Sequence, residues 1–482
     1  MSWEPVIGIE VHVELMTESK MFCGCRVDFE SEPNTNVCPV CLGLPGALPV
    51  PNEKAIEWIT KIGLAFNCEI STVSQFHRKN YFYSDQPKNY QISQFDVPVC
   101  HDGHLEVDTD GEITTVRINR AHMEEDTGKS VHLGDSGRIH GATETMIDFN
   151  RSGVPLVEIV TEADIRSAAE ARAYAQTLRS TVVSLDVSDA KLEEGSIRFD
   201  ANISVRQGPD AEFGTKVEIK NMNSFRSLER AVDYEILRQI AEIEAGGGIV
   251  METRHWDETL GTTSSMRAKE GSSDYRYFPE PDLLPIEVSD EWRDRIAASL
   301  PELPAQQKAR YAEMGLDSDT VDTLIAAPER LRVLLDKALA QGAGAKPVAN
   351  WLTGEVTAYL RREGASLDDV PLTGAHLAQL ATLTNDGAIS ATAAKEVLGG
   401  VLIGEGDPQQ VAESRDLMQI SDIGALEASV DKVIAANVDA FGRFRDGEDK
   451  MVGFLVGQVM KATSGRADPK MVNQILRQRA GK

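Results

Sequence analysis

The sequence predicts an α+β protein: a strand-rich first part, then an all-α helical domain, then a small α-helical tail domain. In the first part apolar and polar residues alternate with a period of two, as in Val6–Leu15 and Ile197–Val205, which is typical of strands with one polar face. Beyond Ser289–Pro304 the chain is rich in Ala, Leu, Glu and Arg, and its apolar residues recur with helical spacing. We therefore expect domains over residues 1–292, 293–406 and 407–482.

Individual elements follow from the same two periods. In the strand-rich part, helical spacing predicts two helices, and Gly246 follows the second as a break. Pro469 stands at the first helical position after a capping Asp468. The expected helices are Ala168–Leu185, Ser227–Ala245, Glu329–Gln341, Val348–Arg361, Thr373–Thr384, Asp422–Ala435, Lys450–Thr463 and Asp468–Gln478.

Composition places the chain among ordinary globular proteins. It has 482 residues, of which 41% are hydrophobic and 26% charged, enough apolar material to bury a core. No apolar run reaches the roughly 18 residues of a membrane span, and the N-terminus lacks the features of a secretory signal. We therefore expect a cytoplasmic protein with no membrane contact.

Charge is distributed unevenly. The formal net charge of −27 argues against non-specific binding of nucleic acids. From residue 461 to 482, however, six Lys or Arg stand against one acid, and Lys461, Arg466 and Lys470 are among them. This tail predicts either a local RNA contact or an ordinary solvated helix.

The N-terminal strand carries the first candidate site. Glu10, His12 and Glu14 are two residues apart, so their side chains share one face, with apolar residues on the other. Carboxylates on such a face suit Mg²⁺, which binds one or two of them together with the phosphates of a nucleotide. A solvated strand face is the alternative.

Three further clusters have the same character, although each could also be a charged turn or a solvated face. Together they resemble an antiparallel sheet with carboxylates for a metal ion and cations for phosphate, as phosphoryl transfer requires. The sequence has no P-loop and no dinucleotide-binding glycine motif, so any use of ATP would rest on this sheet. The clusters are Glu124-Glu125-Asp126, then Arg198 with Asp200 and Asn202, then Glu218 with Lys220 and Asn221.

Four of the six cysteines are grouped. Cys23-x-Cys25 and Cys38-x-x-Cys41 are separated by twelve residues. Short paired spacings of four cysteines favour tetrahedral, structural Zn²⁺, and the alternative is a set of small buried residues.

Cations and aromatic residues are mixed in the segment from 78 to 91. Lys79, Tyr81 and Tyr83 are followed by Lys88. Such mixtures stack bases and bind phosphate, or they form a partly buried aromatic strand.

Several of these segments, in order and over nearly the whole length, resemble the B subunits of the aspartyl/glutamyl-tRNA(Asn/Gln) amidotransferases. The segments are Gly8–Leu15, Arg78–Tyr83, Tyr90–Gln94, Met123–Asp126, Asp148–Arg151, Glu193–Ser196, Glu218–Asn221, Asp274–Pro281 and Gly457–Lys461.

The resemblance implies a ligase of the bacterial heterotrimeric type with a glutamine-synthetase-like antiparallel-sheet cradle domain. ATP would phosphorylate the side-chain carboxylate of Glu-tRNA(Gln) or Asp-tRNA(Asn), and ammonia from a separate amidase (glutaminase) subunit would attack the acyl phosphate. A small linker subunit would hold the other two together, and the tail domain would hold the tRNA.

The resemblance also implies roles for particular residues. Glu10, His12 and Glu125 would bind Mg²⁺, with Glu218 as a weaker candidate ligand. Lys79 and Glu125 would lie near the exit of the ammonia tunnel. From the chemistry of their side chains, and not from the resemblance, the expected substrate or nucleotide contacts are Arg198, Lys220, Asn221, Tyr81, Tyr83 and Lys88. The basic tail adds Lys461, Arg466 and Lys470 as expected tRNA contacts.

Two rival interpretations use the same residues. A free-standing ATP-dependent ligase for a small carboxylate would share the acidic sheet but would need no RNA-binding tail. A zinc-bearing RNA-binding or scaffold protein would need neither Glu10 nor Glu125 for activity. The four cysteines are not universal in the family that the sequence resembles, so zinc is expected to be structural.

Overall fold

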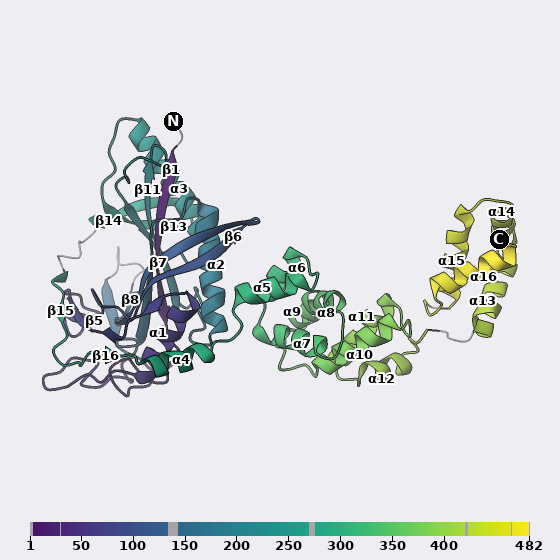
Figure 1. Cartoon of the computed structure of the whole chain (residues 1–482), viewed down its shortest axis with the longest axis horizontal. Helices are drawn as coiled ribbons and strands as arrows, with labels where there is room; N and C mark the ends of the chain where they lie inside the picture. The colour runs from purple at the N-terminus through teal and green to yellow at the C-terminus, as the bar shows by residue number, and fades with distance from the viewer. Residues whose placement is uncertain are drawn as a thin grey trace. The chain divides into compact units, whose positions relative to one another are not determined.

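The computed structural model of the chain (Figure 1) divides into two compact units, Met1–Pro304 and Ala305–Lys482. It describes residues 3–28, 30–133, 143–268, 275–419, 423–463 and 465–481. Lys482, one of the six cations of the basic tail, and Asp422, the expected start of a tail helix, lie outside the described residues.

A nine-stranded sheet forms the centre of the first unit, in the order β14-β13-β12-β11-β1-β10-β7-β6-β2. All of its pairings are antiparallel except that of β12 with β13. The strands are β1 (Glu4–Glu14), β2 (Glu69–Ile70), β6 (Cys100–Thr109), β7 (Glu112–Glu125), β10 (Pro155–Thr161), β11 (Ile197–Arg206), β12 (Val217–Lys220), β13 (Glu252–Asp257) and β14 (Thr262–Ala268).

Smaller sheets complete the first unit. One joins β15, β4 and β5, and it carries the segment of cations and aromatic residues. The strands of the three small sheets are β15 (Phe278–Pro279), β4 (His77–Asn80) and β5 (Tyr90–Ser93), then β16 (Ile286–Glu287) and β3 (Val73–Ser74), then β8 (Lys129–Leu133) and β9 (Glu144–Asp148).

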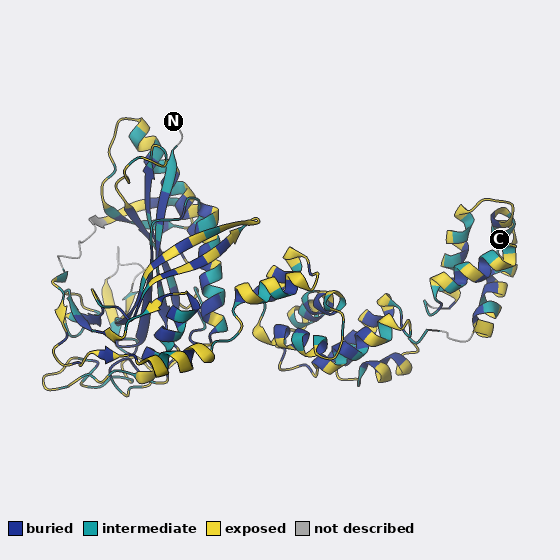
Figure 2. Ribbon diagram, viewed as in Figure 1, coloured by how far each residue is buried: buried dark blue, intermediate teal, exposed yellow. Residues whose placement is uncertain are grey.

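One face of the large sheet is covered by helices α1 (Glu53–Ala65), α2 (Ala168–Ser184) and α3 (Phe225–Glu244). Each begins at a polar N-cap whose side chain accepts hydrogen bonds from the first turn: Asn52, Ser167 and Ser224. Their apolar sides and the sheet share one core, seen as the buried colour of Figure 2. The unit ends with α4 (Asp290–Ala298). Because helices cover that face, the polar residues of the strands gather on the other.

The second unit is helical and has two separate apolar cores. The helices up to Ser414 form the first core, and the helices from Ile423 onward form the second. The helix expected at Val348–Arg361 contains a π-helical turn at Leu352–Val356, and Thr357 Oγ1 donates to the carbonyl of Leu352 there. The first core has α5 (Pro304–Glu313), α6 (Ser318–Ala326), α7 (Glu329–Leu339), α8 (Ala345–Trp351), η2 (Leu352–Val356), α9 (Thr357–Glu363), α10 (Gly374–Asn385), α11 (Ala391–Leu402) and α12 (Pro408–Ser414); the second has α13 (Ile423–Ala436), α14 (Val438–Arg445), α15 (Lys450–Ala462) and α16 (Pro469–Ala480).

A mixed sheet domain followed by helical domains confirms the predicted α+β class. Asp468 caps α16 by accepting from the backbone N–H of Lys470, as its position before Pro469 predicts. Among the described residues, no helix combines the length and the apolar character that crossing a membrane requires. The predicted division at residues 292 and 406 stays a proposal.

Candidate active site on the open face of the sheet

The side chains of β1 divide between the two faces of the large sheet, as the period of two predicts. Ile9, Val11 and Val13 are fully buried in the helix-covered core. Glu10 and His12 alternate with them and are half-buried on the open face. The strands beside β1 set which polar groups they meet.

Register brings acids and cations beside His12. On one side it pairs with Arg198 of β11, and on the other with Glu158 of β10, which in turn pairs with His122 of β7. The His12 Nε2 atom lies 3.7 Å from Glu158 Oε2, and His122 Nε2 lies 3.4 Å from the same oxygen. Glu158 therefore lies between His12 and His122 in a row of side chains across β1, β10 and β7.

Glu124 completes the first acidic group. One ligand atom each from His12, Glu124 and Glu158 lies within 4.8 Å of the others. Glu124 is buried, and burial by itself would raise the pKa of this carboxyl group. The charges of Lys79 and His122 outweigh that effect and lower the Glu124 pKa to about 2.

The first group is therefore anionic at neutral pH. Burial would lower the pKa of His122, but Glu158 and Glu124 raise it. Lys79, on β4, reaches over the sheet and places its Nζ 3.4 Å from Glu124 Oε1. Ser93 of β5 donates to the same oxygen at 2.8 Å. Two elements of the small sheet thus fix the Glu124 carboxylate.

A second acidic group lies on β1, β11 and β12. Ligand oxygens of Glu10, Asp200 and Glu218 lie within 4.8 Å of one another. Lys220 Nζ lies 2.6 Å from Asp200 Oδ2 and 3.7 Å from Glu218 Oε1. Burial would lower the pKa of Lys220, but Asp200 and Glu218 raise it, so this lysine is charged. Asn202 donates to Glu10 Oε1 at 2.9 Å.

Both groups fit Mg²⁺ by the spacing of their donors. With Mg–O distances of about 2.1 Å, opposite vertices of an octahedron are about 4.2 Å apart, and adjacent ones are closer. Donor atoms within 4.8 Å of one another can close on a single ion with small rotations. Carboxylate oxygens are the ligands that this ion prefers, so Glu124 and Glu158 fit it in the first group better than the His12 imidazole does.

A third cluster borders the first. Arg198 donates to Asp126 Oδ2 at 2.8 Å and lies 3.8 Å from Glu14 Oε1. Burial and then the neighbouring Asp126 raise the pKa of Glu14 to about 9. Arg198, predicted to contact phosphate, is therefore held at the site by two buried carboxyl groups.

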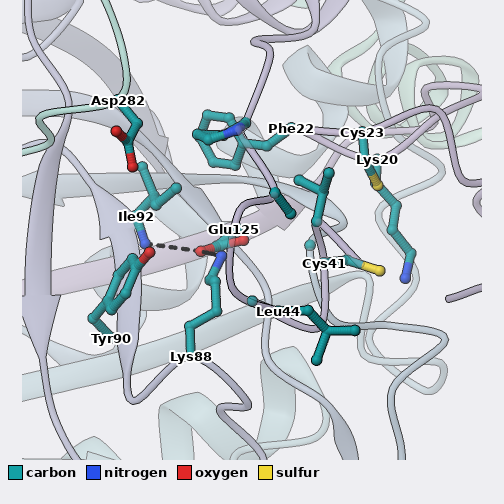
Figure 3. A pocket seen from close by; sticks show the side chains of 15 residues that line it. Lys20, Phe22, Cys23, Cys41, Leu44, Lys88, Tyr90, Ile92, Glu125 and Asp282 are labelled. Atoms are coloured by element: carbon teal, nitrogen blue, oxygen red, sulfur yellow. Dashed lines mark hydrogen bonds and ion pairs between the residues drawn. The ribbon is translucent and has the colours of Figure 1, made fainter. Parts of the chain in front are cut away.

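Glu125 lies elsewhere. Adjacent residues of a strand point to opposite sides, so Glu125 does not join Glu124 beside His12. Its Oε1 accepts from the backbone N–H of Ile92 at 2.9 Å and forms an ion pair with Lys88. Both side chains line a pocket next to the cysteines (Figure 3). The structure does not bring Glu125 to Glu10 or His12, and the expectation that it shares their metal does not fit this geometry.

The predicted aromatic contacts form a chain of rings. The Tyr81 ring centroid is 5.9 Å from that of Tyr83 and 6.3 Å from that of Tyr275, and Lys79 Nζ is 5.3 Å from the Tyr275 ring. These rings therefore border the cation of the first acidic group. Asn221 adopts a left-handed backbone conformation, with φ of 69°, and its side chain meets His255 at 2.6 Å.

The four cysteines come together as predicted. Their Sγ atoms all lie within 4.8 Å of one another, and those of Cys38 and Cys41 are 3.9 Å apart. Tetrahedral Zn²⁺ with Zn–S bonds of about 2.3 Å needs sulfur atoms about 3.8 Å apart, so the donor set fits this ion. A hydrogen bond from Cys23 is the main cause that lowers the pKa of Cys41 to about 5.

In the tail, Lys470 lines a groove between α15 and α16 together with Arg477. Lys461 is in the last turn of α15. Arg466, the third predicted tRNA contact, forms an ion pair with Asp416.

Glu124 and Glu158 were not predicted from the sequence to join His12 in the first group, and neither was the contact of His122 with both. A signal for Glu158 was present: it is one acid in the apolar strand Pro155–Thr161. An ionised side chain in such a strand is costly to bury without a partner, which indicates a role.

Comparison with known proteins assigns two parts of the chain to known families. Residues 5–294 match the family described as GatB/GatE catalytic domain, and residues 333–479 match the family described as GatB domain. The class is thus a catalytic subunit of the GatB/GatE type with a helical GatB extension.

Curated relatives narrow the class. Three relatives are named as the B subunit of aspartyl/glutamyl-tRNA(Asn/Gln) amidotransferase. The relative from Picosynechococcus sp. is 53% identical over 99% of this chain and 97% of its own length. The relative from Carboxydothermus hydrogenoformans is 47% identical over 100% of this chain and 99% of its own length. The relative from Trichodesmium erythraeum is 51% identical over 98% of this chain and 97% of its own length. The chain belongs to this family, the B subunits of the aspartyl/glutamyl-tRNA(Asn/Gln) amidotransferases.

Proposed function

We propose that this chain is the subunit of a tRNA-dependent amidotransferase that activates the side-chain carboxylate of Glu-tRNA(Gln), of Asp-tRNA(Asn), or of both. The observation that carries the proposal is the pairing of two groups of candidate metal ligands with half-buried cations on one open sheet face. Family membership supports the same activity. We further propose that the sheet is a glutamine-synthetase-like cradle, a fold in which acidic strands hold metal ions and ATP.

The reaction would form and break two bonds in turn. A carboxylate oxygen of the aminoacyl group attacks the γ-phosphorus of ATP, and ADP leaves. Ammonia then attacks the carbonyl carbon of the acyl phosphate, inorganic phosphate leaves, and the nitrogen loses a proton. The product is Gln-tRNA(Gln) or Asn-tRNA(Asn).

In this proposal the metal ligands are His12, Glu124 and Glu158 in one group, and Glu10, Asp200 and Glu218 in the other. Bound Mg²⁺ would neutralise the phosphate oxygens of ATP and so favour transfer. Glu124 takes the place of Glu125 because only Glu124 faces His12.

Cations on the same face would contact the phosphoryl group. Lys79 and Lys220 each lie against an acid that a metal ion would neutralise, which would release part of their charge for the nucleotide. Arg198 lies against Asp126, beside the first group. Tyr81 and Tyr83 would border the substrate beside Lys79. Lys88 and Asn221 stay proposals as substrate contacts, and neither lies in the two metal-binding groups.

Partners supply what this chain does not. We propose that an amidase (glutaminase) subunit releases ammonia from glutamine and that a small linker subunit joins the complex. The pocket at Glu125 and Lys88 lies on the other side of β7 from Lys79, and Gln91 contacts both sides, at Glu124 Oε2 and at the Glu125 carbonyl. Ammonia would pass from that pocket toward Lys79. The four cysteines would hold structural Zn²⁺.

The test uses the chain co-purified with its amidase and small subunits. Glu-tRNA(Gln), Mg²⁺ and ATP labelled at the α-phosphate, without glutamine or ammonia, should give labelled ADP in an amount that depends on the acylated tRNA. Uncharged tRNA is the matched control. Release of ADP that ignores the aminoacyl group, or none at all, would contradict the proposal.

A further inference from the structure

A buried lysine stands at the edge of the four-cysteine group. Lys20 is only 1% exposed. It lines the same pocket as Cys23 and Cys41, and Figure 3 shows the three side chains beside one another. Gly153 packs against both: a Cβ atom on it would lie 3.5 Å from Lys20 Cδ and 3.6 Å from Cys41 Cβ.

The local backbone fixes Lys20 at this position. The N–H of Lys20 donates to the carbonyl of Cys25 at 2.9 Å, inside a turn closed by the bridge between Ser19 and Arg26. The N–H of the next residue, Met21, donates to the Gly153 carbonyl at 2.7 Å. Lys20 therefore belongs to the turn that carries two of the four thiols.

The Lys20 ammonium group lacks a carboxylate partner. Its Nζ donates to the carbonyl of Phe149 at 3.1 Å, and in the described part of the chain no carboxylate oxygen lies within the 4.0 Å of an ion pair. Lys88, the other cation of the pocket, is paired with Glu125. A buried ammonium group is costly unless an opposite charge compensates it, and it has three N–H donors to satisfy.

Four zinc-bound cysteines would supply that opposite charge. Four thiolates around one Zn²⁺ leave an excess of negative charge, here in a partly buried site. Hydrogen bonds and charges next to the ligands of a metal ion tune its affinity.

We propose that Lys20 is the counter-ion of the four-cysteine metal site, and that its charge strengthens the binding of Zn²⁺. The inference rests on the proposed zinc. The competing interpretation is that Lys20 only ties the turn at Ser19–Arg26 to the segment from Phe149 to Gly153.

The test compares the zinc affinity of wild type, Lys20→Met and Lys20→Arg in the full chain, by competition with a chromogenic chelator under reducing conditions. Outer-sphere partners of metal ligands are worth about 10- to 100-fold in affinity. We expect a loss of that size for Lys20→Met, and an affinity for Lys20→Arg that is closer to wild type. Lys20→Gln, which keeps a donor for Phe149 without the charge, should behave like Lys20→Met and replaces it if that variant does not fold.

A second measurement separates the two interpretations. The unfolding temperature is recorded with zinc and after its removal. A counter-ion predicts that the neutral variants lose stability mainly in the zinc-bound form. Equal zinc affinity in wild type and the neutral variants, with an equal loss of stability in both forms, would overturn the proposal and leave the zinc site intact. A wild-type chain that holds no zinc would overturn both.

Discussion

Lys79 and Glu124 come from different sheets and meet with their Nζ and Oε1 atoms 3.4 Å apart. The lysine reaches from β4 across the open face of the large sheet, where Glu124 is buried on β7. This pair places the Lys79 ammonium group beside the proposed metal ligands and beside the proposed position of the phosphoryl group.

Replacing Lys79 by Met should make the site depend on metal for its stability. Without its cation, the buried Glu124 next to Glu158 costs about 3 kcal/mol, the order found when one partner of a buried pair is removed. Mg²⁺ should restore part of the lost stability, because the positive charge of Lys79 no longer repels the ion. Calorimetric unfolding temperatures with and without Mg²⁺ measure both effects. Lys54→Met, whose lysine pairs with Glu57 on the surface of α1, is the control and should show neither.

Replacing Glu10 by Gln should weaken the second metal group and leave the first intact. The Mg²⁺ concentration needed for half-maximal ADP formation should rise about tenfold or more. Glu4→Gln, on the same strand but paired with Arg206, serves as the control. An unchanged Mg²⁺ requirement in Glu10→Gln would remove this residue from the ligand set.

Replacing Cys38 or Cys41 by Ser should lower zinc content and stability together. Folded protein that remains should still form ADP, because a site with four thiolate ligands has no open position for chemistry. Cys68→Ala, at a buried cysteine outside the group, should keep its zinc. A well-folded, zinc-free variant without phosphoryl transfer would contradict the structural role.

Replacing Lys461 or Lys470 by Ala should raise the KM for tRNA and weaken its salt dependence. The slope of log affinity against log salt should fall by about one unit for each phosphate that the tail no longer binds. Arg479→Ala is the matched control, since its guanidinium is held by Asp431 at 2.9 Å within the same group of tail helices. Equal salt slopes in wild type and in the Lys461, Lys470 and Arg479 variants would argue against contact between the tail and tRNA.

The sequence predicted much of this site because alternation along a strand is local information. The shared face of Glu10 and His12 and the convergence of four cysteines follow from spacing alone. The choice between Glu124 and Glu125 does not, since adjacent acids point to opposite sides and only the register of β7 against β10 decides which one faces His12.

The remaining parts depend on contacts between distant segments. Lys79 reaches Glu124 only because β4 and β5 form a separate sheet that lies over β7. A single acid in an apolar strand marks Glu158 as unusual, but that pattern does not predict its partners, His12 and His122, which come from β1 and β7. Long-range pairing of this kind leaves no periodic signal in a single sequence.

The proposed role of Glu124 as a metal ligand is best tested by comparing Glu124→Gln with Glu125→Gln in the complex with the amidase and small subunits. Both variants receive Glu-tRNA(Gln), ATP, Mg²⁺ and free ammonia, and Gln-tRNA is measured with tRNA binding as the control. We expect a loss of about 100-fold or more for Glu124→Gln, as for the removal of one preorganised electrostatic group, and a much smaller loss for Glu125→Gln. Full activity of Glu124→Gln, or no product from wild type, would contradict this assignment.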